Sequence, residues 1–205
     1  MTPARFWDRA APKYSQRPIG NMAAYEAGLA RVRSHLTGSD RLLELGCGTG
    51  GTARRLAPHV SEVTATDISP AMIAIARTRA AEESVTNITH LTASLEGSLP
   101  AGPFDVVAGF NLIHLLPDPE RDIARIRDLV KPGGLFISKT PCLTGLFGLL
   151  RPVVGAMRLA GRAPKVHFLS PARLDRAVTA AGFEIIETGN YPKSPPGHLI
   201  VARRV

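Results

Sequence analysis

The sequence predicts a doubly wound α/β fold, in which helices cover both faces of a mostly parallel, Rossmann-like sheet. Short apolar segments typical of buried strands alternate with helical patterns along the chain. Three expected helices begin with a Ser-Pro or Asp-Pro pair, which places a capping side chain before a proline at the first helical position. The 205 residues fit one domain, residues 1–205, and the 44% of apolar residues suffice for a buried core.

The expected elements begin with a helical N-terminal segment, residues 1–38, where apolar residues recur at intervals of three and four before Gly38. Helices are also expected near residues 52–57 and after Ser69, Asp118 and Ser170. A turn is expected at residues 131–134. Strands are expected over residues 41–45, 62–66, 88–91, 104–110, 135–138, 183–187 and 199–203. Because only a loop joins the last two strands, they are expected to pair as an antiparallel hairpin at the sheet edge.

Composition excludes several functional classes. Of the 25 basic residues 20 are arginines, scattered as on the solvated faces of several helices, so the net charge of +8 does not indicate a nucleic-acid partner. Cys47 and Cys142 form no CxxC pair and have no histidine at ligand spacing, so neither a metal site nor a disulfide framework is expected. The N-terminus lacks the apolar core of a signal peptide, which favours a cytoplasmic location with reduced thiols.

A glycine-rich loop, residues 46–51, runs directly from the first strand into a helix. Glycines at 46, 48 and 50 allow sharp turning and close approach to a ligand, and the amides at the helix start are free donors. A tight turn without a ligand is the plainer interpretation. Gly46, Gly48 and Gly51 also satisfy the G-x-G-x-x-G dinucleotide pattern, so the loop alone does not choose the cofactor.

Two carboxylates narrow the choice of ligand. Asp67 ends the second strand, 21 residues after Gly46, where it can accept hydrogen bonds from the ribose hydroxyls of an adenosine; the alternative is a local helix cap. No arginine follows Asp67 to receive a 2′-phosphate, which disfavours NADP. Glu44 stands on an otherwise apolar strand and suits a cationic ligand better than a pyrophosphate. Its alternative is a partly exposed side chain paired with an arginine.

Four motifs in register closely resemble the class I S-adenosylmethionine-dependent methyltransferases. They are Leu42 to Gly50, Asp67, Phe104 to Val107 leading to Leu112 to Leu116, and Val130 to Gly134. The segment from Phe6 to Tyr14 resembles the start of the small-molecule, ubiquinone/menaquinone-biosynthesis-like group. The resemblance implies a seven-stranded sheet with only its last strand antiparallel, and S-adenosylmethionine as cofactor.

The resemblance also implies a cofactor site. It places the methionine part of the cofactor beside Glu44, Gly46, Cys47, Gly48 and Gly50. Asp67 and Ile68 are then expected to hold ribose and adenine, and Asn111 to face the sulfonium. In one departure from the family, Ser94 stands where many members place an acidic residue for the adenine amino group, so a weaker contact is expected there.

Methyl transfer from a sulfonium is an in-line displacement, so alignment in a dry pocket is the main requirement and a base is needed only where the acceptor loses a proton. His114 is the nominated catalytic residue, although it also fits a packing role beside the fourth strand. The other candidate bases are Tyr14, His167, Tyr191 and His198.

Acceptor recognition is expected from the N-terminal helices and from the insertion at residues 141–168. The insertion carries large apolar residues, Phe147 and Met157 among them, interspersed with basic ones, which favours a lid over a small, apolar or aromatic acceptor; a membrane-surface amphipathic helix is the alternative. The function predicted is therefore S-adenosylmethionine-dependent methylation. An NAD-dependent oxidoreductase and a non-catalytic cofactor-binding module are the alternatives, and the oligomeric state stays open.

Overall fold

The computed structural model describes residues 2–97 and 99–205, and the side chains of residues 145–147, Phe147 included, lie outside the described part. In chain order the elements are α1 Pro3–Ser15, α2 Met22–Arg33, β1 Arg41–Leu45, α3 Gly51–Leu56, η1 Ala57–His59, β2 Glu62–Asp67, α4 Pro70–Glu82, β3 Ile88–Thr92, β4 Phe104–Phe110, η2 Ile113–Leu115, α5 Pro119–Leu129, β5 Val130–Pro141, η3 Gly145–Leu150, α6 Arg151–Leu159, α7 Pro171–Ala180, β6 Phe183–Asn190 and β7 Gly197–Arg204.

The strands form one seven-stranded sheet in the order β3-β2-β1-β4-β5-β7-β6. The pairs from β3 through β5 are parallel, and β7 runs antiparallel to both of its neighbours. The predicted fold class is confirmed, including the hairpin of β6 and β7, in which β6 takes the edge. Strand order reverses between β1 and β4, and the carboxyl ends of the strands at such a switch point are where open α/β sheets bind ligands.

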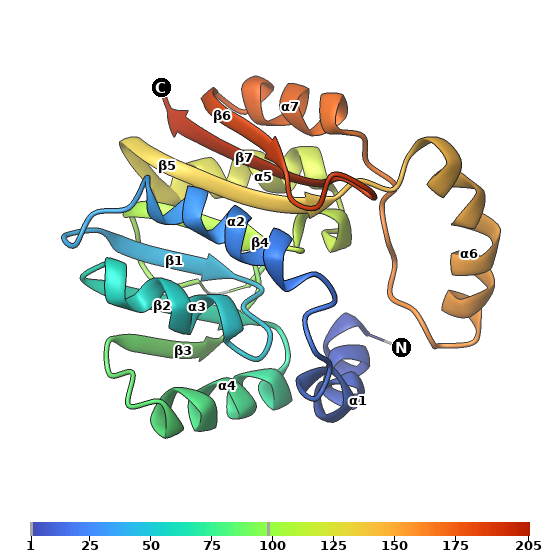
Figure 1. Cartoon of the computed structure of the whole chain (residues 1–205), viewed down its shortest axis with the longest axis horizontal. Coiled ribbons are helices and arrows are strands. Elements are labelled where there is room, and N and C mark those ends of the chain that lie inside the picture. The colour runs from blue at the N-terminus through green and yellow to red at the C-terminus, as the bar shows by residue number, and fades with distance from the viewer. Residues whose placement is uncertain (1, 98) are drawn as a thin grey trace.

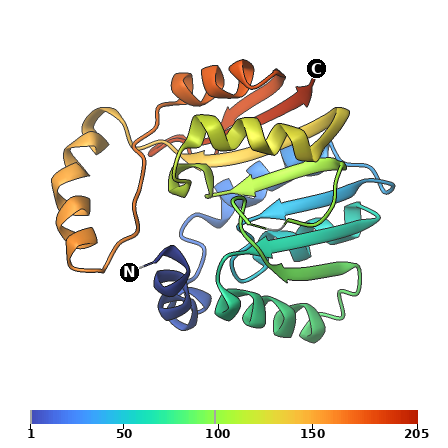
Figure 2. The ribbon, with the colours of Figure 1, turned by 180° about the vertical axis from the view of Figure 1, so that it is seen from behind.

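Helices cover both faces of the sheet, as Figures 1 and 2 show from opposite sides. On one face, Leu29 of α2 and Leu56 of α3 pack into a buried apolar cluster with the strands. On the other face, Ile123 of α5 and Leu174 of α7 join a second cluster. The sheet is therefore fixed on both sides, which holds the carboxyl ends of its strands in place.

The one clear difference from the predicted strands is at residues 131–134, where a turn was expected. There, β5 already begins at Val130, which pairs with Phe104, and the register shifts before Leu135 pairs with Val106. Residues 131–134 are thus extra residues in a continuous strand, a bulge in which Gly133 takes a φ of +74°. A Pro-Gly-Gly signal marks a bend of the chain, and it does not tell a bulge from a turn.

Two helices lie beyond the carboxyl ends of the parallel strands instead of on a face of the sheet: α1 and α6 (Figure 1). The N-terminal segment 1–38 is helical as predicted, in two pieces, α1 and α2. In the insertion, 141–168, the helix α6 runs through Gly155. None of the described helices is long and apolar enough to cross a membrane.

Candidate functional site

A cavity of about 1090 Å³ lies where the carboxyl ends of the strands meet α1 and the insertion. Its sheet side is formed by Gly46, Gly48, Asp67 and Ile68. Its outer side is formed by side chains from α1, from the segment after β4 and from the end of α6. Concave sites of this size are typical of cofactor and small-molecule binding.

The glycine loop turns sharply between β1 and α3. Gly46 and Gly48 have φ values of +65° and +53°, which side chains disfavour. A Cβ atom at Gly46 would lie 2.8 Å from a methyl carbon of Leu112, so the loop packs closely on the segment after β4. At Gly48 the only described atom within 4 Å of such a Cβ is Tyr14 Cε1, at 3.8 Å. The loop therefore leaves room on its cavity side.

Asp67 ties the glycine loop to the start of α4. Its Oδ2 accepts a hydrogen bond from the Gly48 amide at 2.9 Å, and its Oδ1 accepts one from the Ser69 amide at 2.9 Å. Burial raises the pKa of the Asp67 carboxyl, and these amide donors lower it. The N-cap of α4 is Ser69, whose Oγ accepts from the Met72 amide. Asp67 thus lines the cavity without being needed as the cap.

Glu44 lies behind the glycine loop and is only 2% exposed. Burial, followed by repulsion from Asp67, raises the pKa of its carboxyl to about 8. Its Oε2 atom has no hydrogen-bond partner among the described residues. The expected alternative, a partly exposed glutamate paired with an arginine, is therefore wrong. An orphaned carboxyl oxygen at this place suits a cationic ligand, whose charge would favour the ionised carboxylate.

The other nominated cofactor residues divide into two groups. Ile68, Ser94 and Asn111 line the cavity with Gly46, Gly48 and Asp67. Asn111 has a φ of +54°, and its amide donates to the Lys139 carbonyl at 2.7 Å, so a strained residue is held at the cavity wall. Cys47, Gly50 and Glu44 lie behind that wall; the Cys47 amide donates to the Thr66 carbonyl at 2.9 Å.

Helix α1 is fastened over the site by three hydrogen bonds that the sequence did not reveal. Asp8 Oδ1 accepts from Ser69 Oγ at 2.6 Å and from the Ala71 amide at 3.2 Å. At the other end of α1, Arg79 donates to the Ser15 carbonyl at 2.6 Å. These contacts turn the aromatic side chains of α1 towards the cavity, which they line: Phe6, Trp7 and Tyr14.

His114, the nominated catalytic residue, is not among the cavity-lining residues of the described chain. The His167 amide donates to the His114 carbonyl at 2.7 Å, so the two histidines are neighbours. Burial, followed by His167, lowers the pKa of His114 to about 4, which keeps its ring neutral. His114 Nδ1 and His167 Nε2 are buried without hydrogen-bond partners among the described residues. The catalytic role of His114 stays a prediction.

The remaining candidate bases are separated by the fold. Tyr14 lines the cavity, and burial, followed by Asp67, raises the pKa of its hydroxyl. His198 is 4% exposed and its Nε2 lies 2.8 Å from Asp175 Oδ1, outside the cavity lining. Tyr191 packs against Gly28 on α2. Of these three, only Tyr14 reaches the site. Within the described residues, no group of three His, Cys, Asp or Glu side chains is arranged to hold a metal ion.

The fold and the site define a doubly wound α/β protein with a large cavity at the carboxyl ends of its strands and a buried, unpaired carboxyl oxygen of Glu44 behind the glycine loop. Comparison with known proteins supplies the family. The methyltransferase domain family matches residues 6–188. A ubiquinone biosynthesis O-methyltransferase of Xanthomonas euvesicatoria pv. vesicatoria is 31% identical over 199 residues, covering 93% of this chain and 80% of that protein.

Solved structures have a fold similar to that of this chain. The DhpI–SAH complex has 25% identity and a TM-score of 0.74, covering 98% of this chain and 94% of that one. An S-adenosylmethionine-dependent methyltransferase from Mesorhizobium loti has 23% identity and a TM-score of 0.71, covering 89% of this chain and 98% of that one, and shows the same fold.

The chain belongs to the methyltransferase domain family, and it is a class I S-adenosylmethionine-dependent methyltransferase. This confirms the resemblance seen in the sequence and decides against an NAD-dependent oxidoreductase and against a non-catalytic module. The residues present fit the cofactor, because a buried, unpaired Glu44 oxygen suits its cationic part and the open side of Gly48 leaves space for it.

Proposed function

We propose that this enzyme methylates an oxygen atom of a small, apolar or aromatic acceptor, bound between α1 and the 141–168 insertion. The observation that carries the proposal is the single cavity that joins the glycine loop to Phe6, Trp7 and Leu159. Transfer to oxygen is supported by the O-methyltransferase activity named for the curated relatives.

We propose the following roles at the cofactor. S-adenosylmethionine, when bound, supplies an electrophilic methyl group on a sulfonium. Glu44 balances its positive charge, because an opposite charge favours the ionised carboxylate. Asp67 and Ile68 bind ribose and adenine, with Ser94 as the weaker adenine contact, and Asn111 faces the reacting centre. The glycine loop holds the methionine part through Gly46, Cys47, Gly48 and Gly50.

The chain's own contribution to the reaction is alignment and exclusion of water. Phe6, Trp7 and Leu159 provide apolar walls on the acceptor side. The Tyr14 hydroxyl, kept neutral by its raised pKa, acts as a hydrogen-bonding group that orients the acceptor oxygen. A phenolic acceptor enters as the phenolate, having given its proton to solvent outside the cavity, and His114 serves as base only if η2 shifts towards the cavity.

The test has two parts. Thermal unfolding of the purified protein is expected to shift upward with S-adenosylmethionine and S-adenosylhomocysteine and not with NAD; a ligand at 100 times its dissociation constant stabilises by about 2.7 kcal/mol. A labelled methyl donor is then offered with phenols, amines and carbon acids. Label on phenols supports the proposal. Label on amines or carbon acids alone would refute transfer to oxygen.

Exposed apolar residues of η3 and α6 favour a second candidate role, contact with a membrane surface. Leu159 is 92% exposed, Leu149 76% and Val153 55%, beside basic residues of the same insertion. Cosedimentation with anionic phospholipid vesicles tests this role. It requires activity to rise with vesicles and this rise to be lost when Arg158 and Arg162 are neutralised, whereas a lid requires no dependence on vesicles.

A further inference from the structure

The charged residues that line the cavity are unequally paired. They are Asp67, Glu96, Asp122, Arg158 and Lys165. All three carboxylates already have donors: backbone amides for Asp67, and Arg121 Nη2 for Glu96 at 3.1 Å and for Asp122 at 3.2 Å. Their charges are therefore largely satisfied within the protein.

The two cations are not paired in this way. The Arg158 guanidinium has no hydrogen bond or ion pair with any residue that the structure describes. The Lys165 ammonium donates to the Pro117 carbonyl at 3.3 Å, a neutral group. The insertion that carries both, residues 141–168, contains no aspartate or glutamate, so it supplies no counter-ion of its own.

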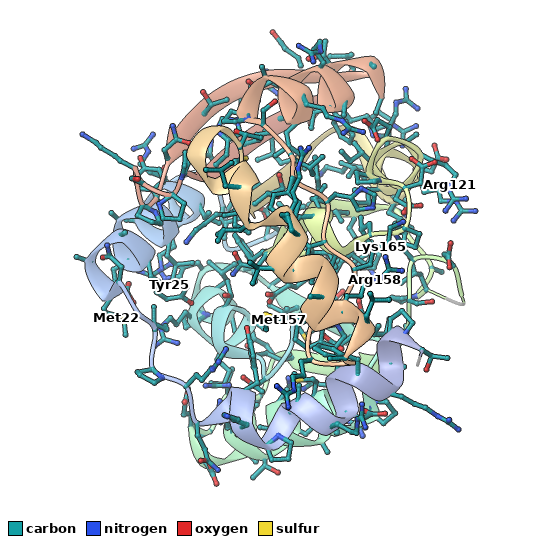
Figure 3. All side chains as sticks on the ribbon, turned by 90° about the vertical axis from the view of Figure 1, so that its right-hand side faces the viewer. Met22, Tyr25, Arg121, Met157, Arg158 and Lys165 are labelled. Atoms are coloured by element: carbon teal, nitrogen blue, oxygen red, sulfur yellow. The ribbon has the colours of Figure 1, made fainter. Side chains whose placement is uncertain are left out.

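Both cations belong to the acceptor side of the cavity. Figure 3 shows Arg158 and Lys165 on the same side of α6, with α1 below this helix. Three apolar residues also line the cavity. Leu159 follows Arg158 in the sequence, and Leu115 and Leu116 belong to the segment after β4. The lining thus combines apolar surface with two unpaired positive charges, remote in sequence from the glycine loop.

We propose that Arg158 and Lys165 bind an anionic group, a carboxylate or a phosphate, on the acceptor. This inference rests on the proposed function and narrows its acceptor to an apolar body that carries a negative charge away from the methylated atom. A charge-assisted contact with a guanidinium and an ammonium fixes the direction in which such an acceptor enters. The net charge of +8 assists the encounter with an anion.

The test compares anions with neutral esters on the protein loaded with S-adenosylhomocysteine. Hydroxylated phenyl, naphthyl and medium-chain alkyl compounds are used, each as carboxylate, phosphonate and methyl ester, with binding measured by calorimetry. On the scaffold that binds best, one anion is expected to bind at least about tenfold tighter than its ester. Comparison of the carboxylate and phosphonate compounds shows which anionic group the protein binds more tightly. Equal binding of esters, or no binding of any anion, would overturn the proposal.

Three single variants locate the effect. Arg158→Met and Lys165→Met are each expected to reduce the preference for the anion several-fold and to leave S-adenosylhomocysteine affinity unchanged. Arg162→Met is the matched control, because Arg162 lies between the two on the same insertion and is not among the cavity-lining residues described. An equal loss in the control would mean that the overall charge of the insertion is responsible, and the proposal would fail.

Kinetic and vesicle-binding measurements distinguish recognition of an anionic acceptor from contact with a membrane surface. With labelled methyl donor, Arg158→Met is expected to raise KM for the anionic acceptor and to leave kcat near the parent value, since binding is lost equally in the ground and transition states. Methylation of neutral esters as fast as acids would overturn this inference and still support the proposed function. Binding to anionic vesicles that all three variants weaken, without preference for soluble anions, would assign the cations to a membrane surface instead.

Discussion

Replacing Glu44 with glutamine is expected to stabilise the cofactor-free enzyme at neutral pH and to weaken its binding of S-adenosylmethionine. The carboxyl is 2% exposed, and burial followed by Asp67 raises its pKa from 4.5 to about 8. Glutamine keeps the shape of the protonated side chain and removes the ionisable group. Stability and ligand binding therefore make opposite demands on this position.

The size of the effect follows from linkage. In the unfolded chain the carboxyl ionises near its ordinary pKa of 4.5, and in the folded protein only near 8, so the unfolded state releases its proton first as pH rises. The contribution of the Glu44 carboxyl to the free energy of unfolding is therefore most favourable below about pH 4.5, and it is lost as pH rises towards 8. At about 1.4 kcal/mol per pKa unit, the loss is roughly 3 kcal/mol at pH 7 and roughly 5 kcal/mol above pH 8.

Urea unfolding of the two proteins at about pH 5, 7 and 9 measures this, with stability extrapolated to water. The advantage of Glu44→Gln is expected to grow from pH 5 to pH 9. Glu184→Gln, on the edge strand β6, is the control for removing a carboxyl elsewhere and is expected to show no such growth. A difference between Glu44→Gln and parent that stays constant over this range would refute the reasoning.

Calorimetry gives a second readout. A cationic ligand favours ionised Glu44, so binding of S-adenosylmethionine is expected to release a proton and to tighten about tenfold between pH 7 and pH 9 in the parent enzyme. Glu44→Gln removes this dependence. If the variant binds as tightly as the parent and with the same pH dependence, Glu44 does not meet the cofactor.

Four further outcomes are expected. Asp67→Ala should weaken cofactor affinity by calorimetry while the fold survives, because α4 keeps its own N-cap. Asp8→Ala should release α1 and raise its cleavage by protease, by loss of the contacts at the start of α4. Leu159→Ser should lower acceptor turnover and leave cofactor affinity intact, by loss of apolar cavity wall. Glu187→Gln should lower the free energy of unfolding by about 1 kcal/mol or less at pH 7. This difference fades as pH falls towards about 2, because the hydrogen bond from Arg31, as the largest cause, lowers the pKa of the Glu187 carboxyl to about 2.

Signals that act over a few residues were sufficient to predict most of the fold. Ser69, Asp118 and Ser170 each cap the helix that follows, accepting a hydrogen bond from the amide three residues on. Such caps, the apolar strands between them and the loop without a helix before β7 determine the order of elements. The bulge at residues 131–134 was missed because it depends on pairing with β4, which no local pattern encodes.

The site was predictable where backbone conformation creates it and not where distant side chains meet. Gly46 and Asp67 could be nominated because a glycine loop and a strand end are local features. Nothing near Asp8 indicates that it bonds to α4, since that contact joins residues 61 positions apart. His114 is the converse case, because its neighbour along the sequence, Leu115, lines the cavity and His114 does not.

The two halves of the cavity are built differently, and this bears on how the enzyme chooses its acceptor. The cofactor side uses backbone amides and side chains fixed between two buried clusters of the sheet. The proposed acceptor side is formed by α1, held through Asp8, and by α6, which buries no residue. Substitutions in the insertion therefore meet few packing constraints, and we expect them to change which acceptor binds without disturbing the methyl donor. Acceptor specificity is for this reason expected to map to residues 141–168, where we expect substitutions of Arg158 and Lys165 to change it most directly.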